Sequence, residues 1–339
     1  MNNWKGKYGP FLIAEIGGNH EGDFEYAQEL TQLACESGVD AVKFQIYTGD
    51  SLVNKVIDPD RNNHFKRFEL NRDQYVKLAN QCKDNNVLFT ASVWDASAFD
   101  WINDHLPFYK IGSGDLTAFP IIDIIISYGK PIILSTGLST MVEVEKSVKY
   151  IQTKNDSYKD SNNFGLLQCT SMYPIPNEDA NLNVMLEYKN KFNIAVGYSD
   201  HTIGTTAVET AVAMGAQIIE FHFTDTREEK SFRDHQVSFT KEEVIQLIEK
   251  IKLIKSLKGD GVKKPLKSEI EADHVTSFRR GLYFARDMKK GENISIQDLI
   301  MLRPNHDIST NDYQIILGKE LIKKVKKNDK ITWDCFASK

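Results

Sequence analysis

Ile-Ala-Val-Gly-Tyr-Ser-Asp-His-Thr, residues 194–202, is the first of two stretches that decide the fold; the second is Ile-Ile-Glu-Phe-His-Phe-Thr at 218–224. Both are apolar runs without alternation, which is typical of parallel strands covered by helices. The segment between them, 203–214, has a helical pattern, so one strand–helix unit separates His201 from His222. We therefore expect the two imidazoles side by side at the same end of neighbouring strands, where parallel sheets bind ligands and metals.

Six further apolar runs alternate with helical patterns before these two. They lie at residues 11–17, 40–47, 86–93, 108–114, 131–137 and 164–171. Eight such units in about 250 residues is the count of a (β/α)8 barrel. A doubly wound open sheet, the alternative, usually has fewer strands and carries Gly-x-Gly-x-x-Gly after its first strand, which this sequence lacks. We predict an α/β fold with a (β/α)8, or TIM, barrel over residues 1–258.

The pattern changes after the barrel. Gly259-Asp260-Gly261 and Lys263-Lys264-Pro265 end the last helix and predict a linker over residues 259–276. From residue 277 the apolar runs are short and turn residues are frequent. We therefore predict a small β-rich domain over residues 277–339, which is too short for a second barrel.

The composition is that of an ordinary globular protein. The 339 residues are 41% hydrophobic and 26% charged, which suits one large and one small domain. We expect neither a membrane helix, which needs roughly 18 apolar residues, nor a signal peptide. The four cysteines are scattered and form no Cys-x-x-Cys pair, so we expect free thiols in a reducing cytoplasm.

Charge is unevenly distributed along the chain. The net charge is −5, yet residues 259–339 carry 16 basic and 12 acidic side chains, a net +4, which leaves −9 for the first 258. A basic segment of this kind docks on an acidic body or binds nucleic acid. Because no aromatic residues interleave a basic stripe, we expect a solvated or docking surface and no nucleic-acid partner.

Polar side chains crowd the second half of the predicted strands, where a barrel interior is normally apolar. They are Glu15, Lys43, Gln45, Ser92, Lys110, Ser113, Ser135, Thr170, Ser171, Ser199, His201 and His222. Buried charges are costly unless paired, so lysines and a glutamate at matching depth indicate a polar ligand. Lys43 and Lys110, with Ser113 and Ser135, predict a phosphate or carboxylate pocket; the alternative is that the lysines pair with interior acids.

The histidine pair predicts a metal site. Asp234, just after the last strand, would add an oxygen ligand directly or through water, and two imidazoles with oxygens suit Mn²⁺, Zn²⁺ or Fe²⁺, with Mg²⁺ as an alternative. Glu15 would act as a general base or position a water molecule; its alternative role is to pair with Lys43. We assign five other histidines to the surface or to loops: His64, His105, His235, His274 and His306.

Several blocks together resemble the sialic acid synthase family, enzymes that make nonulosonic acids from phosphoenolpyruvate and an N-acylated hexose. The barrel blocks are Ala14–His20, Val42–Gln45, Tyr109–Gly114, Leu134–Gly137, Cys169–Pro174, Gly197–Thr202 and His222–Thr224. The C-terminal segment resembles the antifreeze-like (SAF) domain of the same enzymes, in Arg280–Tyr283, Asp287–Gly291 and Leu302–Pro304. The resemblance covers nearly the whole chain, in order.

The resemblance implies roles for individual residues. A divalent metal, Mn²⁺ as first choice and Mg²⁺ as alternative, would be held by His201 and His222, with Glu15 positioning water. Contacts to phosphoenolpyruvate would come from Lys43, Gln45, Lys110, Ser113, Ser135, Ser171 and Ser199, and contacts to the sugar from Tyr173 and Asp234. Chains of this family pair, so that Arg303 in the SAF domain of one would reach the sugar in the other, as a domain-swapped homodimer.

The implied reaction is a metal-assisted condensation that releases phosphate. The default sugar is N-acetylmannosamine, which gives N-acetylneuraminate; the alternatives are the diacetamido hexoses that lead to legionaminic or pseudaminic acid. The chain departs from the family around Trp94, at Ser171 and over residues 225–235, near the expected sugar side. Two other functions stay open: a Schiff-base aldolase with Lys43 or Lys110 as nucleophile, and a non-catalytic sugar- or ice-binding protein built on the small domain.

Overall fold

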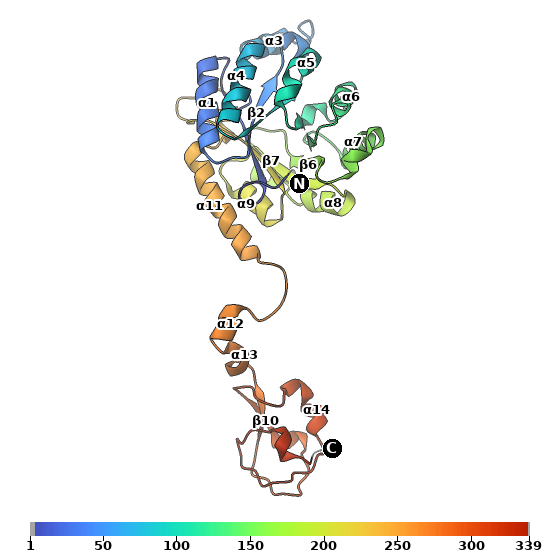
Figure 1. Cartoon of the computed structure of the whole chain (residues 1–339), viewed down its shortest axis with the longest axis vertical. Helices are drawn as coiled ribbons and strands as arrows, with labels where there is room; N and C mark the ends of the chain where they lie inside the picture. Colours follow the sequence, from blue (N-terminus) through green and yellow to red (C-terminus); the bar gives the residue numbers. More distant parts are fainter. Residues whose placement is uncertain (1–3, 338–339) are drawn as a thin grey trace. The chain divides into compact units, whose positions relative to one another are not determined.

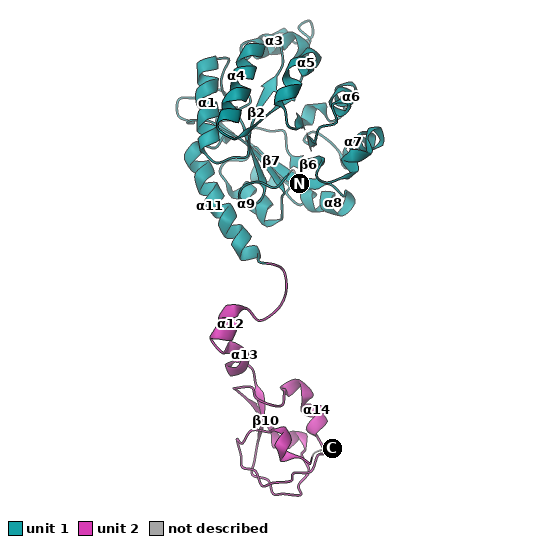
Figure 2. Ribbon diagram, viewed as in Figure 1, with its two compact units in different colours: residues 1–259 teal, residues 260–339 magenta. Residues whose placement is uncertain are grey.

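The computed structural model describes residues 4–337, and the chain divides into two compact units at Gly259 (Figure 2). The domains predicted from the sequence also include residues 1–3 and 338–339, which lie outside the described residues. Among residues 4–337, no helix has both the length and the apolar character needed to cross a membrane.

The first unit is the predicted barrel of eight parallel strands (Figure 1). The strands are β1 (Phe11–Glu15), β2 (Ala41–Ile46), β3 (Leu88–Val93), β4 (Tyr109–Ile111), β5 (Ile132–Ser135), β6 (Phe164–Cys169), β7 (Ala195–Asp200) and β8 (Ile218–His222). Hydrogen-bonded neighbours follow the order β3-β2-β1-β8-β7-β6-β5-β4. The Thr90 hydroxyl of β3 donates to the Phe108 carbonyl beside β4 at 2.9 Å, so the barrel is nearly closed.

Helices surround the strands. They are α1 (Phe24–Glu36), α2 (Gly49–Leu52), α3 (Pro59–Lys66), α4 (Arg72–Asp84), α5 (Phe99–Ile102), α6 (Phe119–Ser127), α7 (Met141–Lys154), α8 (Val184–Lys191), α9 (Thr206–Ala213), α10 (Asp234–Val237) and α11 (Lys241–Lys258). Local sequence sets their starts: Thr240 and Glu243 form a capping box at the first turn of α11. Two short helices, α2 and α3, lie in the long connection between β2 and α4, above the carboxyl ends of the strands.

The barrel interior has an apolar layer and a polar layer. The apolar layer is formed by Phe11, Ile13, Ala41, Phe108, Ile133, Leu167, Ala195 and Ile218, with Trp4 packed against it. Because side chains alternate along a strand, the residue two positions later points to the same side. Ile13 is thus followed by Glu15, and Ile218 by Glu220, so the polar layer lies directly above the apolar one.

The second unit is small and contains little regular structure. It has a two-stranded antiparallel sheet of β9 (Gly281–Phe284) and β10 (Leu299–Leu302), and a short helix, α14 (Tyr313–Ile316). Its own core includes Leu282, Phe284 and Ile331, all fully buried. The segment predicted as a linker contains two short helices, α12 (Lys267–Glu271) and α13 (His274–Ser277).

Candidate active site

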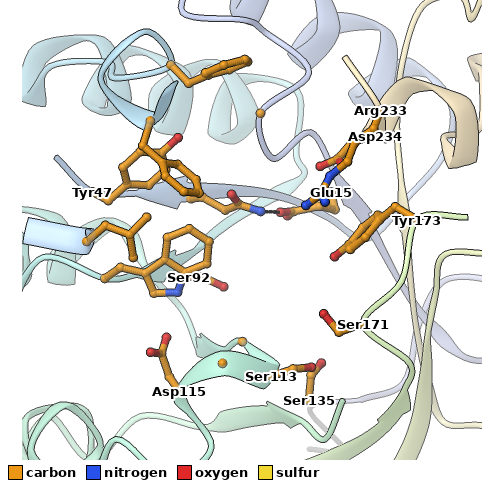
Figure 3. A pocket seen from close by; sticks show the side chains of 18 of the residues that line it. Glu15, Tyr47, Ser92, Ser113, Asp115, Ser135, Ser171, Tyr173, Arg233 and Asp234 are labelled. Carbon is orange, nitrogen blue, oxygen red and sulfur yellow. Dashed lines mark hydrogen bonds and ion pairs between the residues drawn. The ribbon is translucent and has the colours of Figure 1, made fainter. Parts of the chain in front are cut away.

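A cavity of about 1040 Å³ opens at the carboxyl ends of the barrel strands (Figure 3). Its floor is the polar layer, and its rim is formed by the loops after β1, β2, β3 and β8. Pockets for one drug-sized ligand occupy about 300–1,000 Å³. The cavity therefore has room for two small substrates at once.

One half of the floor is a buried charge network around Lys110 and Glu220. Lys110 Nζ donates to Ser135 Oγ at 2.7 Å and lies 3.5 Å from Glu220 Oε1. The same carboxylate oxygen accepts from Ser199 Oγ at 2.9 Å. Burial lowers the pKa of Lys110, and Glu220 compensates only in part. Burial alone would raise the pKa of Glu220, but Lys110 and Lys43 outweigh it and the net pKa is lowered.

Lys43 and Glu15 form the second ion pair of the floor. Lys43 Nζ lies 2.6 Å from Glu15 Oε2, and Gln45 Nε2 donates to Glu15 Oε1 at 2.7 Å (Figure 3). Burial raises the pKa of Glu15, and the charge of Lys43 offsets only part of the rise. For Lys43 the balance is reversed: burial lowers its pKa, but Glu15 and Glu220 raise it more. A buried carboxylate with a raised pKa has the character of a proton acceptor.

The two histidines meet as the sequence predicts, with ring centroids 5.2 Å apart. His201 Nδ1 lies 2.9 Å from the Thr170 carbonyl, which can only accept, so Nδ1 carries the proton, and in the neutral ring Nε2 keeps its lone pair. Burial opposes the charged form of this ring, but Cys169 and the Thr170 carbonyl raise the pKa of His201 above its ordinary value. His222 is buried, and its Nδ1 has no hydrogen-bond partner. Burial lowers the pKa of His222 well below its ordinary value, and the neighbouring His201 lowers it further.

These two nitrogen donors fit a divalent metal whose other ligands are oxygens. Among the residues that the structure describes, no group of three or more His, Cys, Asp or Glu is arranged to hold a metal. Asp234 Oδ2 lies 3.9 Å from His222 Nδ1. Water or substrate would have to complete the coordination, which is the open arrangement of a catalytic rather than a structural site.

Tyr173 lies beside Arg233 and Asp234 at the cavity (Figure 3). The Tyr173 ring packs on His201 with centroids 4.1 Å apart. Arg233 also packs on this ring, with its guanidinium carbon 4.7 Å from the centroid, and its Nε donates to Asp234 at 3.3 Å. Burial raises the pKa of Asp234, and Arg233 opposes the rise.

The structure brings together the predicted site residues of the barrel except Thr170, whose hydroxyl donates to the Asp179 carbonyl outside the cavity. Those that line the cavity are Glu15, Lys43, Gln45, Lys110, Ser113, Ser135, Ser171, Tyr173, Ser199, His201, His222 and Asp234. Arg303 belongs to the second unit, where its guanidinium lies 5.3 Å from the ring centroid of Phe278.

Sequence reasoning missed three carboxylates that line the cavity, Glu220, Asp115 and Asp58. Glu220 was detectable, because it lies two positions before His222 on the same strand and so faces the same side. Asp115 lies in a 3-10 turn and Asp58 at the start of α3, where strand alternation does not apply. Burial raises the pKa of Asp115, and Lys110 and the Trp94 indole lower it.

Two histidine assignments were wrong. His235 is fully buried; its Nδ1 lies 2.7 Å from Thr224 Oγ1 and its Nε2 lies 3.2 Å from Glu21. It ties α10 to the loops after β1 and β8, so it holds the rim of the cavity. His64 lines the cavity itself. Neither residue follows a predicted strand, and this is why the strand pattern placed both outside the site.

Comparison with known proteins agrees with this geometry over nearly the whole chain. An N,N'-diacetyllegionaminic acid synthase of Legionella pneumophila is 35% identical, with 96% of this chain and 94% of that protein covered. An N-acetylneuraminate-9-phosphate synthase of Drosophila melanogaster is 30% identical, covering 95% and 94%. A crystal structure of N-acetylneuraminic acid synthetase from Leptospira borgpetersenii, in complex with citrate, superposes with a TM-score of 0.72 at 30% identity, covering 78% and 90%.

Family models match both units. The NeuB family model matches residues 30–263, and the SAF domain model matches residues 279–337. The first match spans more than half of the chain, and the predicted family and SAF domain are thereby confirmed. The chain belongs to the NeuB family, a family of nonulosonic acid synthases, and is an enzyme of that class.

Proposed function

We propose that this enzyme condenses phosphoenolpyruvate with an N-acylated hexose and releases phosphate, in a metal-dependent reaction. The observation that carries the proposal is the cavity floor, where two buried lysines and a set of serine hydroxyls lie beside two facing imidazoles. The first group suits a small, highly charged anion, and the second suits a metal with open positions.

Phosphoenolpyruvate would bind over Lys43 and Lys110. Both ammonium groups are buried, so a phosphate or carboxylate next to them interacts at low dielectric. Ser135 already orients Lys110, and the Ser113 hydroxyl accepts from the Gly137 amide at 3.0 Å, which fixes its oxygen at the cavity wall. These contacts would hold the anion before the sugar enters.

The carbon–carbon bond would form between C3 of phosphoenolpyruvate and the aldehyde carbon of the open-chain sugar. A divalent metal held by His201 and His222, Mn²⁺ first and Mg²⁺ second, would polarise that aldehyde as a Lewis acid. Water then adds at C2 of the former phosphoenolpyruvate, and the tetrahedral centre expels phosphate to leave a 2-keto acid. Glu15 would take the proton of this water, because its carboxylate is buried at the floor and Gln45 fixes its orientation.

The names of relatives favour a diacetamido hexose over the default N-acetylmannosamine. Two proteins named N,N'-diacetyllegionaminic acid synthase are 35% and 34% identical to this chain, with at least 94% of each chain covered. Proteins named N-acetylneuraminate-9-phosphate synthase are 30–33% identical, and two named pseudaminic acid synthase are 31% identical. We rank the legionaminic precursor first on this basis.

We also propose a homodimer in which the second unit of one chain supplies Arg303 to the cavity of its partner. The charges of the two segments, +4 and −9, favour such contacts. In the second unit Phe278 is 55% exposed next to Arg303, which suits a surface that a partner covers. All four cysteines are free thiols, which supports the expected cytoplasmic location.

The decisive assay offers phosphoenolpyruvate with N-acetylmannosamine or with each diacetamido hexose, in Mn²⁺, in Mg²⁺ and in chelator. Phosphate release and product mass are followed together. We expect phosphate and a nine-carbon keto acid only with metal. Reduction by borohydride that traps pyruvate on Lys43 or Lys110, with full activity in chelator, would instead support the Schiff-base aldolase.

A further inference from the structure

Six aromatic rings form a continuous belt along one side of the cavity. We define the aromatic belt as Trp94, Tyr47, Phe65, His64, Phe68 and Phe232, all of which line the cavity. Successive ring centroids in this order lie 5.5, 5.3, 5.5, 4.8 and 4.9 Å apart. Aromatic pairs at such spacings are in packing contact.

The belt lies on the opposite side of the cavity from the anion-binding serines. It comes from the connections after β2, β3 and β8, including α3, whereas Ser135 ends β5 and Ser113 and Ser171 follow β4 and β6. Figure 3 shows Tyr47 at the upper left and these three serines at the lower right. The cavity therefore has a charged half and an aromatic half.

Phe232 closes the belt from a distant part of the sequence. Its ring packs on Phe68 and also lies flat against Gly18, where an added Cβ would approach the ring to 3.0 Å. Few polar atoms belong to the belt: Arg67 bonds His64 Nδ1 at 3.1 Å, the Trp94 indole lies near Asp115 and lowers the pKa of that carboxyl, and the Tyr47 hydroxyl and His64 Nε2 remain for a ligand. What the belt offers to a ligand is mainly apolar ring surface.

Two arginines near the belt are also partly occupied. Arg61 lies over Phe65, 5.7 Å from the ring centroid. Arg233 lies over Tyr173 and bonds Asp234. If either arginine were free to bind a phosphate on the end of the sugar remote from the aldehyde, the cavity would favour a phosphorylated sugar. Arg233 is held by a ring and a carboxylate, but the ring contact of Arg61 leaves its N–H groups able to bind an anion, and the 6-phosphate sugar in the test below distinguishes the two cases.

We propose that the aromatic belt reads the end of the sugar remote from the aldehyde and selects a substrate with methyl groups there. This rests on the proposed function, in which phosphoenolpyruvate occupies the charged half and the aldehyde lies at the histidines. The rest of the sugar must then extend along the aromatic half. A hydroxyl or phosphate placed against rings loses its hydrogen bonds to water without replacement, whereas a C6 methyl or an N-acetyl methyl does not.

The test compares three sugars that differ only at C6: N-acetylmannosamine, its 6-deoxy analogue and its 6-phosphate. With saturating phosphoenolpyruvate and Mn²⁺, we expect kcat/KM to be about 10- to 100-fold higher for the 6-deoxy sugar than for the 6-hydroxy sugar, the range that a hydrophobic pocket achieves. The 6-phosphate should be the poorest. Equal values for the first two sugars, or a preference for the phosphate, would overturn the proposal; the latter would assign Arg61 and Arg233 to phosphate recognition.

Two variants at one position locate the effect. Phe232→Ser should bring the ratio of the two sugars close to one and leave the KM for phosphoenolpyruvate within about twofold, because only the aromatic half changes. Phe232→Leu keeps an apolar side chain and should keep the preference. If Phe232→Ser has wild-type thermal stability and keeps the wild-type ratio of kcat/KM between the two sugars, Phe232 has no part in the selection.

Calorimetric binding of each sugar separates this inference from the proposed function. If neither these sugars nor a diacetamido hexose is turned over, the condensation is wrong, but the belt still predicts tighter binding of the 6-deoxy sugar. If turnover occurs and the affinities and kcat/KM values are equal, the condensation stands and the belt has no role in selection.

Discussion

Replacing Glu220 by Gln tests whether the cavity floor is a balanced charge network. The floor contains two ammonium groups and two carboxylates in the wild type, and Glu220→Gln leaves one positive charge in excess. Lys43 still has Glu15 at 2.6 Å. Lys110 keeps only neutral partners, the Ser135 hydroxyl and the Ile111 carbonyl. The variant therefore isolates one buried ammonium without a counter-charge.

The distances set the size of the effect. At an effective dielectric constant of about 20, a unit charge pair at the 3.5 Å between Lys110 and Glu220 is worth about 5 kcal/mol. Repulsion between Glu220 and Glu15, which disappears in the variant, reduces this figure. Removal of one partner from a buried ion pair generally costs about 3–5 kcal/mol. We expect Glu220→Gln to lower the free energy of unfolding by about 3 kcal/mol.

Urea unfolding of the ligand-free enzyme at pH 7.5 measures this loss. Phosphoenolpyruvate should restore more stability to Glu220→Gln than to the wild type, because it brings negative charge to the unpaired ammonium. The double variant Lys110→Met, Glu220→Gln removes both charges and should regain most of the loss; together with Lys110→Met alone it completes the cycle that gives the coupling. A single variant as stable as the wild type, with no coupling in the cycle, would refute the charge balance.

Three further predictions follow from the same structure. Burial lowers the pKa of His20 to about 4. As the pH falls below about 6.5, the unfolded chain therefore binds a proton at this residue before the folded chain does, and about 2 kcal/mol of stability should be lost between pH 7 and 5. His20→Asn, which keeps an acceptor, should make the free energy of urea unfolding less dependent on pH over this range; an unchanged pH dependence would contradict the prediction. His201→Ala or His222→Ala should lower Mn²⁺ affinity in calorimetry and reduce phosphate release at least about 100-fold; near-normal turnover in either would remove the metal assignment. Arg303→Ala and Glu15→Gln should each be nearly inactive. If Arg303 acts across a dimer, a mixture of the two variants after subunit exchange should recover about a quarter of wild-type activity, because half of the dimers are mixed and each mixed dimer has one intact site. No recovery in mixed dimers would place Arg303 in the site of its own chain or outside the site.

The barrel could be predicted from the sequence because each strand is a short apolar run between helical patterns. The same regularity locates much of the site. Once Ile13 and Ala41 are assigned to the apolar layer, the alternation of the strand places Glu15 and Lys43 above them at one depth. Glu220 was not assigned to the site because it lies inside the apolar run 218–224, where a single carboxylate looks like an interruption of the strand pattern. Its role depends on Lys110, which is more than one hundred residues away in the sequence.

The aromatic belt could not be predicted in this way. His64, Phe65 and Phe68 lie in and just after α3, in a connection whose position over the barrel no periodicity describes. Phe232 reaches them from the loop after β8, and this loop is fixed by contacts such as the buried His235, which the sequence pattern assigned to the surface. The two segments that depart from the family, around Trp94 and over residues 225–235, both contribute rings to the belt.

The charged half of the cavity could be predicted from the sequence and the aromatic half could not, and the physical reason for this difference bears on function. The charged half of the cavity is built from strand residues, whose direction is fixed by the pleat and whose depth is fixed by the register between neighbours. A change of one residue there would break a buried ion pair, so the reaction class is tied to the fold itself. The aromatic half is built from loops, where Phe232 can be exchanged without disturbing a ladder hydrogen bond. Barrels with the same floor can therefore differ in the sugar that they accept, and we expect the belt, together with the proposed sugar contacts of Tyr173, Asp234 and Arg303, to set the choice in this enzyme.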